Sequence, residues 1–278
     1  IVLAFDRSLS MLGPPLADAK AAAHEFIDRL ELGPSRLGLV TYADWATAEV
    51  RLTSQALVLH RAIDRIEADG TTDIPDALRE AGRMLDRDGG SNLPIIVLMS
   101  DGKNTTGPDA VRQQAAIQQA AGRAILTVAI GPYADSEVMR AIASTPDDAF
   151  EADRSGDLAD LYRRVAARLS SVVVRWVRME GVVPDGVVYV PDSAEPPADY
   201  AHGGLAWELP FASADGVSLR YALRTTRLGR QPTNRWARAL FEDSSGRAGS
   251  AEFPVPEVRV VDTLPTATPT PTATATAT

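Results

Sequence analysis

The chain opens with Ile1-Val2-Leu3-Ala4-Phe5-Asp6-Arg7-Ser8-Leu9-Ser10, an apolar run that ends in one carboxylate and two hydroxyl side chains. The apolar part predicts a buried β-strand. The oxygen atoms of Asp6, Ser8 and Ser10 suit a hard cation such as Mg²⁺. Because Asp and Ser are also common in turns and helix caps, this stretch alone leaves two alternatives, a cation site and a turn.

Apolar runs alternate with segments of helical periodicity from residue 1 to about residue 171. The runs that predict strands lie at 1–5, 37–42, 48–52, 94–99 and 125–130. Helical spacing recurs over 16–30, 74–85, 110–121 and 158–169, with Gly89-Gly90 as the stop of the second helix. Wholly apolar strands between helices predict an α/β fold with a doubly wound, mainly parallel sheet covered on both faces.

The pattern changes near residue 171, where helical periodicity stops. Short β-branched or alternating runs predict strands at 172–177, 187–190, 205–209, 217–224, 236–241 and 257–261. Turn signals separate these runs, which is typical of an all-β sandwich. We therefore expect a first domain at 1–171, a β-sandwich at 172–263 and a disordered linker at 264–278. The linker is rich in Thr, Pro and Ala, a composition that cannot bury a core.

The composition narrows the possible functions. The 278 residues carry a net charge of −9, which argues against a nucleic-acid partner. The absence of Cys excludes disulfides, thiolate metal sites and cysteine nucleophiles. No apolar run is long enough for a membrane span. The chain begins within a predicted strand and without an initiator Met, so we expect a fragment of a longer protein.

Polar side chains follow two of the predicted strands and precede one helix. The first set is quoted above, and Ser100-Asp101-Gly102 follows the strand at 94–99. Gly70-Thr71-Thr72-Asp73 comes just before the helix at 74–85. Thr72 or Asp73 as a helix cap would explain that segment structurally. Strand ends and helix starts meet at one edge of an α/β sheet, where ligands bind, and three such segments together favour a cation site.

Together these segments resemble the von Willebrand factor A family, which carries Asp-x-Ser-x-Ser, a helix-start Thr and a later Asp in this order. The resemblance covers residues 1 to about 170. By motif, the metal-ion-dependent adhesion site of that family corresponds to Asp6, Ser8, Ser10, Thr72 and Asp101. The family usually has Gly where Thr71 stands, and the spacing to Ala77-Leu78 favours Thr72 as the metal-facing threonine.

The resemblance implies a bound divalent cation, Mg²⁺ or else Mn²⁺ or Ca²⁺. Mg²⁺ takes six oxygen ligands and usually keeps some water. If few carboxylates bind it directly, the ion retains affinity for an acidic oxygen from outside. The resemblance therefore implies a protein ligand whose Asp or Glu side chain completes the coordination.

The second domain is similar to immunoglobulin-like repeats of bacterial surface proteins. The similarity rests on Pro184-Asp185-Gly186-Val187-Val188-Tyr189-Val190 and on Leu205-Ala206-Trp207-Glu208-Leu209. It implies a spacer or presentation module that has Tyr189 and Trp207 in its core.

Enzyme motifs are missing from the sequence. It has neither a Gly-x-Ser-x-Gly elbow nor a phosphate-binding loop. Of the three His residues, His24 lies on the predicted helix at 16–30, and no pair has metal-binding spacing. A Mg²⁺-dependent phosphoryl hydrolase that uses Asp6 and Asp101 is a third alternative. Since no nucleophile or general base accompanies them, we predict that the chain is not an enzyme.

These observations lead to one expected function and one main alternative. We expect a cation-dependent protein-binding or adhesion module on the outside of a bacterial cell, where a Thr/Pro-rich stalk is useful. The alternative is an intracellular A-domain subunit that docks on an AAA-type chelatase or chaperone.

Overall fold

The computed structural model describes residues 1–261 except 31, 34, 90–92, 103, 171, 215, 226 and 244–246. The predicted linker at 264–278 and Gly90 of the predicted helix stop therefore lie outside the described residues. The chain divides into two compact units, Ile1–Ser171 and Val172–Thr278. In the described part of the chain, no helix combines the length and the apolarity that crossing a membrane requires.

The first unit is built on one six-stranded sheet in the order β3-β2-β1-β4-β5-β6. Its elements are β1 (Val2–Asp6), η1 (Leu9–Met11), α1 (Pro14–Arg29), β2 (Leu37–Tyr42), β3 (Ala46–Thr53), α2 (Ala56–Asp64), α3 (Ile74–Asp88), β4 (Ile95–Ser100), α4 (Pro108–Ala120), β5 (Ala124–Ile130), α5 (Ser136–Ile142), η2 (Pro146–Asp148), β6 (Ala149–Ala152), η3 (Ser155–Asp157) and α6 (Leu158–Ser170). Neighbouring strands run parallel except β2 and β3. The predicted mainly parallel α/β fold is confirmed. Sequence periodicity missed α2, α5 and β6, which are nine, seven and four residues long.

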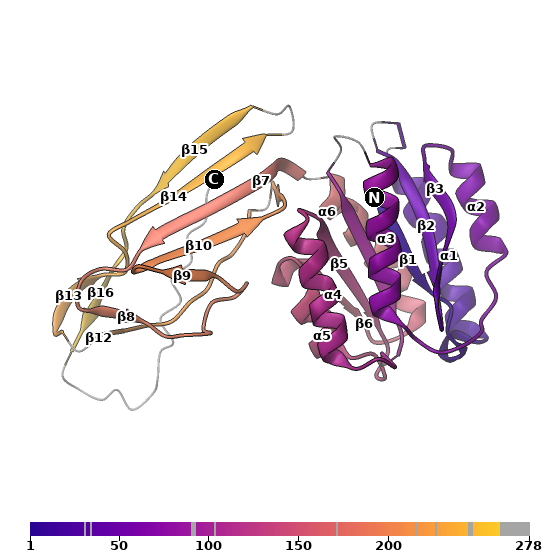
Figure 1. The fold of residues 1–278 in the computed structure, drawn as a ribbon, viewed down its shortest axis with the longest axis horizontal. Helices are drawn as coiled ribbons and strands as arrows, with labels where there is room; N and C mark the ends of the chain where they lie inside the picture. The colour runs from indigo at the N-terminus through magenta and orange to yellow at the C-terminus, as the bar shows by residue number, and fades with distance from the viewer. Residues whose placement is uncertain are drawn as a thin grey trace. The chain divides into compact units, whose positions relative to one another are not determined.

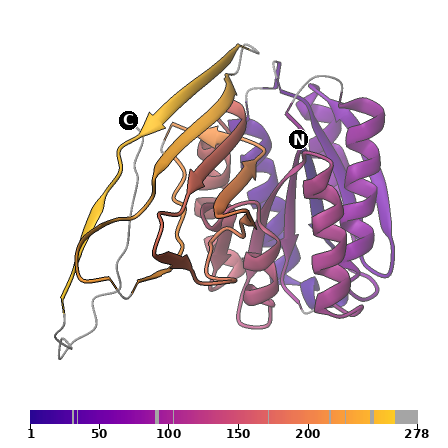
Figure 2. The same ribbon diagram turned by 60° about the vertical axis from the view of Figure 1, so that its left-hand side comes forward.

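Helices cover both faces of this sheet (Figures 1 and 2). Every residue of β1, β2, β4 and β5 is buried, although successive strand residues point to opposite faces. On one face, Val2 packs in an apolar cluster with Leu78 of α3 and Val111 of α4. On the other, the ring centroids of Phe26 in α1 and Tyr162 in α6 lie 5.2 Å apart. Burial on both faces explains why these strands are apolar throughout.

Gly38 in β2 occupies a position with no room for a side chain. A Cβ atom there would lie 2.3 Å from Met84 Sδ of α3 and 3.2 Å from the carbonyl oxygen of Val50. Met84 is fully buried, so its thioether cannot swing out into solvent. We expect Gly38→Ala to lower the free energy of unfolding by about 1–3 kcal/mol in urea denaturation, because added atoms overpack a close-packed core.

Gly156→Ala is the matched control for this substitution. A Cβ atom on Gly156 would meet no atom within 4 Å, so its effect should stay within about 0.5 kcal/mol. Equal stability of the two variants would contradict the close packing of α3 on β2.

The second unit is all-β in its described part. Its strands are β7 (Val172–Val182), β8 (Val187–Tyr189), β9 (Asp199–Ala201), β10 (Gly204–Leu209), β11 (Ala212–Ser213), β12 (Leu223–Thr225), β13 (Gly229–Pro232), β14 (Trp236–Asp243), β15 (Ala248–Phe253) and β16 (Glu257–Val260). The main sheet has the order β15-β14-β7-β10-β9, and β11 pairs with β7. Two further strand pairs, β12-β8 and β13-β16, complete the unit, and all of these pairings are antiparallel.

The predicted strand at 217–224 is wrong over most of its length. Only its last residues belong to β12, and Arg220 makes an isolated bridge with Glu195. Leu219 and Tyr221 nevertheless pack against apolar clusters, as their alternation indicates. Period-two alternation therefore identified the side chains that face the core. It does not reveal whether a neighbouring strand is present to form the hydrogen bonds of a sheet.

The predicted core residues of the second unit are confirmed. Tyr189 and Trp207 are both buried and share one apolar cluster with Leu205 and Val183. Trp207 Nε1 donates a hydrogen bond of 3.0 Å to the carbonyl oxygen of Pro196, which satisfies the indole inside this cluster.

Candidate metal centre

The ends of β1 and β4 lie side by side in the middle of the first unit's sheet. The two strands are parallel neighbours, and Asp6 ends β1 while Ser100 ends β4, just before Asp101. The strand order reverses between them, with β2 and β3 on one side and β5 and β6 on the other. Ligands of open α/β sheets bind at the carboxyl ends of strands at such a switch point. The fold thus places both predicted aspartates where a ligand site is expected.

Hydrogen bonds link four of the predicted ligands to one another. Ser8 Oγ and Ser10 Oγ lie 2.8 Å apart, and Ser10 Oγ donates to Asp101 Oδ1 at 2.7 Å. Asp6 Oδ1 accepts from the backbone N–H of Ser8 at 2.8 Å, a turn interaction. Ser8 precedes the 3-10 turn η1, but its hydroxyl makes no capping hydrogen bond. Helix capping therefore does not account for the serine hydroxyls.

Thr72 comes to the same place from the loop before α3. Backbone hydrogen bonds tie the three loops together: Leu9 N–H donates to the Gly70 carbonyl at 3.1 Å, and Thr105 N–H donates to the Thr72 carbonyl at 2.9 Å. A Cβ atom on Gly102 would lie 3.4 Å from Ser10 Oγ and 3.6 Å from Thr72 Oγ1. Both hydroxyls therefore border one small space that the absence of a side chain at Gly102 leaves open.

The two neighbours of Thr72 have other roles. Thr71 donates to Asp44 Oδ1 from its hydroxyl at 2.6 Å and from its N–H at 2.8 Å. Asp73 caps α3, because its Oδ1 accepts from the N–H of Asp76 at 2.9 Å. The capping role that the sequence left open thus falls to Asp73, and Thr72 is the threonine that lies with the serines.

Ser100 is a member of the cluster that the sequence analysis did not select. Its fully buried hydroxyl donates to Asp6 Oδ2 at 2.8 Å, so both carboxylate oxygens of Asp6 are held in place. The sequence does carry a signal for Ser100: it places a hydroxyl at the end of an otherwise apolar strand, directly before Asp101.

Asp6 is a buried carboxylate beside a second one. Burial raises the pKa of Asp6 from its ordinary value of 3.8 to about 6, against the lowering effect of hydrogen bonds from Ser8 and Ser100. The charge of Asp101 raises the pKa of Asp6 further, and burial also raises the pKa of Asp101. Burial is the largest cause of both shifts. A bound cation would offset the repulsion between the two carboxylates and lower the pKa of each.

The available donor groups fit a hard divalent cation. Three hydroxyls and two carboxylates, supplemented by water, can provide the six oxygens that Mg²⁺ requires. Within the described residues, no group of three or more His, Cys, Asp and Glu side chains could hold a metal ion. A cation at this edge would therefore depend on the hydroxyl groups.

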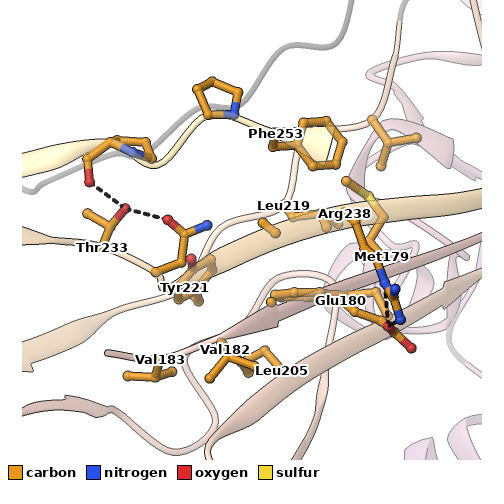
Figure 3. Close-up of a pocket in the computed structure, with 17 residues that line it drawn as sticks. Met179, Glu180, Val182, Val183, Leu205, Leu219, Tyr221, Thr233, Arg238 and Phe253 are labelled. Atoms are coloured by element: carbon orange, nitrogen blue, oxygen red, sulfur yellow. Dashed lines mark hydrogen bonds and ion pairs between the residues drawn. The ribbon is translucent and has the colours of Figure 1, made fainter. Parts of the chain in front are cut away.

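The second unit contains a cavity of about 80 Å³, shown in Figure 3. Its lining is largely apolar and includes Leu219 and Phe253. Two polar groups in the lining are paired: Arg238 with Glu180 at 2.9 Å, and the Thr233 hydroxyl with a backbone carbonyl at 3.1 Å. Small-molecule sites usually measure about 300–1,000 Å³, so this cavity is smaller than a typical ligand site and is a weaker candidate than the strand-end cluster.

Comparison with known protein families agrees with the fold of the first unit. The family model of the von Willebrand factor type A domain matches residues 1–164. The chain belongs to the von Willebrand factor type A family. Its first unit is a VWA domain, and the resemblance seen in the sequence is confirmed at the level of family and fold. VWA domains are commonly protein-interaction modules.

Two curated relatives of this VWA protein have no described activity in their names. An uncharacterised protein of Synechocystis sp. is 26% identical over 176 residues, 62% of this chain and 42% of that protein. A UPF0353 protein of Mycolicibacterium vanbaalenii is 29% identical over 224 residues, 66% of each chain. The chain thus spans 42% and 66% of the length of these relatives.

Solved structures share the fold. A von Willebrand factor type A protein from Catenulispora acidiphila has a TM-score of 0.73 at 17% identity, covering 94% of this chain and 65% of that one. Proximal thread matrix protein 1 from the mussel byssus, solved with a zinc-occupied MIDAS motif, has a TM-score of 0.53 at 24% identity. That alignment covers 59% of this chain and 44% of the mussel protein. At these identities the likeness shows the fold alone.

Proposed function

We propose that the VWA domain holds a divalent cation at the ends of β1 and β4 and uses it to bind an acidic side chain of a partner protein. The ligands would be Asp6, Ser8, Ser10, Thr72 and Asp101, with Mg²⁺ as the ion and Mn²⁺ or Ca²⁺ as substitutes. The observation that carries this proposal is the hydrogen-bonded set Ser8–Ser10–Asp101 at the switch point of the sheet. The zinc-occupied motif of the mussel protein supports a metal on this fold.

The chemistry of the cluster favours an ion that keeps affinity for an outside carboxylate. The hydroxyl ligands are neutral, and both oxygens of Asp6 already accept hydrogen bonds from Ser8 and Ser100. The charge that the protein offers the ion is therefore limited. A carboxylate from a partner would complete the oxygen set.

Exposed apolar side chains lie near Ser10, the exposed serine of the strand-end cluster. Ser10 is exposed, and Leu9 and Leu12 beside it are 57% and 66% exposed. Trp45 follows Asp44, which accepts a hydrogen bond from Thr71, and is 60% exposed. Aromatic and apolar anchors around a polar contact are typical of protein–protein interfaces. The expected partner therefore presents an acidic side chain next to apolar ones.

A peptide array tests this function. Peptides containing Asp or Glu beside apolar residues are paired with their Asn or Gln counterparts and probed with the labelled protein in Mg²⁺ or in EDTA. Wild type and Thr71→Val should bind acidic peptides in Mg²⁺ only, and Thr72→Val should bind none. Trp45→Ala should bind peptides more weakly while keeping its metal affinity. Binding that survives EDTA, or that ignores the acid-to-amide change, would contradict the proposal.

For the second unit we propose an immunoglobulin-like β-sandwich that acts as a spacer. Support comes from the shared cluster of Trp207 in β10 and Tyr189 in β8, which joins strands of separate sheets, and from its packing with Leu223 of β12. In such a sandwich the Trp207 indole N–H should exchange with solvent slowly, whereas that of Trp236, which is 43% exposed, should exchange fast. Equal exchange rates in an NMR measurement would contradict the packing.

We further propose that the protein works at the outside of a bacterial cell, because of the Thr-, Pro- and Ala-rich sequence at 264–278. Protease treatment of intact cells of the source organism should then cleave the protein. The alternative, docking on an AAA-type chelatase or chaperone, predicts full protection from the protease and co-purification with an ATPase.

A further inference from the structure

A pair of histidines lies between α1 and α2, outside the strand-end cluster. The rings of His24 and His60 stack with their centroids 4.9 Å apart, and their Nδ1 atoms are separated by 2.6 Å. Each outer nitrogen faces a carboxylate: His24 Nε2 lies 3.0 Å from Asp64 Oδ1, and His60 Nε2 lies 3.1 Å from Asp28 Oδ1. Sequence spacing could not indicate this pair, because packing between two helices brings the rings together.

The two carboxylates favour the tautomer of each ring that directs the Nδ1 lone pairs toward each other. An ionised carboxylate only accepts hydrogen bonds, so each Nε2 must carry a hydrogen to satisfy its partner. A neutral imidazole has one ring hydrogen, which leaves both Nδ1 atoms with bare lone pairs facing each other. Facing lone pairs 2.6 Å apart repel unless a positive ion is shared between them. A single proton or a metal ion can supply that charge.

We propose that His24 and His60 form a binding site for a transition-metal ion such as Zn²⁺ or Cu²⁺, ligated by both Nδ1 atoms. Imidazole nitrogen suits these metals, whereas Mg²⁺ prefers oxygen. A carboxylate that accepts the far N–H of a histidine also fixes the tautomer and orientation that metal binding needs. Asp64 and Asp28 are placed for this role.

The geometry and the exposure of the pair allow an ion to enter. Zn–N bonds of about 2.0–2.1 Å at a tetrahedral ion place two ligand nitrogens about 3.3 Å apart, so the two Nδ1 atoms, which are 2.6 Å apart, must separate by about 0.7 Å to hold the ion. The His24 and His60 side chains are 29% and 24% exposed. Since the described residues contain no three-membered group of His, Cys, Asp and Glu for a metal, water completes the coordination. A bound ion would connect α1 to α2.

Electron paramagnetic resonance of the full chain with one equivalent of Cu²⁺ tests the site. Wild type should show hyperfine coupling to two nitrogens. His24→Gln and His60→Gln should each lose one coupling and bind Cu²⁺ at least tenfold more weakly. Asp28→Ala and Asp64→Ala should keep both nitrogens but lose about tenfold in affinity. Asp6→Asn should leave the signal unchanged, because the strand-end cluster offers only oxygen atoms, and His202→Gln is the matched histidine control.

Two results would overturn this inference. One is a Cu²⁺ spectrum without nitrogen coupling in wild type. The other is a two-nitrogen signal that persists in both His24→Gln and His60→Gln, which would place the ion elsewhere. Neither result bears on the strand-end site, whose test uses Mg²⁺ or Mn²⁺ and different residues.

Discussion

Asp6→Asn should make the metal-free protein more stable by about 2 kcal/mol at pH 7.5 and should also abolish its response to Mg²⁺. Asn has the shape of Asp and can pair with the N–H of Ser8 and the hydroxyl of Ser100, which hold Asp6 in the wild type. It removes a buried negative charge that lies beside Asp101. The same charge that destabilises the metal-free fold is needed to hold the ion.

The pH dependence of stability explains why the substitution is expected to stabilise the protein. Asp6 has a pKa of about 6 in the folded protein, against an ordinary value of 3.8 when unfolded. Between these values the folded state binds more protons, so the stability of metal-free wild type falls as the pH rises from about 4 to about 6. The Asp6→Asn variant should not lose stability in this way, because Asn does not ionise. Urea denaturation in EDTA should show the full difference at pH 7.5 and little difference near pH 4.

The response to metal completes the test. Mg²⁺ at about 100 times its Kd should stabilise wild type by about 2.7 kcal/mol and Asp6→Asn not at all. Asp69→Asn is the control, since this carboxylate is 76% exposed on a neighbouring loop, and it should behave as wild type. A metal-free Asp6→Asn protein that is less stable than wild type at pH 7.5 would contradict the account of the buried charge.

Asp148→Ala should lower the free energy of unfolding of the VWA domain by about 3–5 kcal/mol. Asp148 is fully buried, with Oδ1 3.1 Å from Nε of Arg168 and Oδ2 accepting from the Thr145 hydroxyl at 2.7 Å. Burial raises the pKa of Asp148, while the charge of Arg168 opposes that rise. Removing the carboxylate leaves the buried positive charge of Arg168 without this counter-charge, which is far costlier than losing a surface pair.

The adjacent residue provides a matched control. Asp147 is exposed, so Asp147→Ala should change stability by no more than about 0.5 kcal/mol. Hydrogen exchange with mass spectrometry locates the loss of stability in the domain. Faster exchange in α6 and β6 is expected for Asp148→Ala alone. Equal exchange in the two variants would show that the Asp148–Arg168 pair does not stabilise this part of the domain.

The fold of the first unit was largely predictable because its strongest signals are physical ones. Strands buried on both faces are apolar throughout, and β1, β2, β4 and β5 were found within one or two residues. The second unit was harder. Many of its strands have only two to four residues, and alternation at 217–224 marked core-facing side chains in a segment that forms almost no ladder.

The candidate site was predictable only as a set of residues. Motif order selected Asp6, Thr72 and Asp101, but the bond from Ser100 to Asp6 depends on β4 lying next to β1. Likewise, only the structure shows that Thr71 pairs with Asp44. Such contacts join residues far apart in the chain, and periodicity carries no information about them.

Calorimetric titration of Mg²⁺ and Mn²⁺ into wild type, Thr71→Val and Thr72→Val tests most directly whether the strand-end cluster is a cation site. Each substitution replaces a hydroxyl by a methyl group of similar size. We predict one bound ion with the same affinity for wild type and Thr71→Val, and at least tenfold weaker binding for Thr72→Val. Wild-type affinity in Thr72→Val, or loss of binding in Thr71→Val alone, would contradict the assignment.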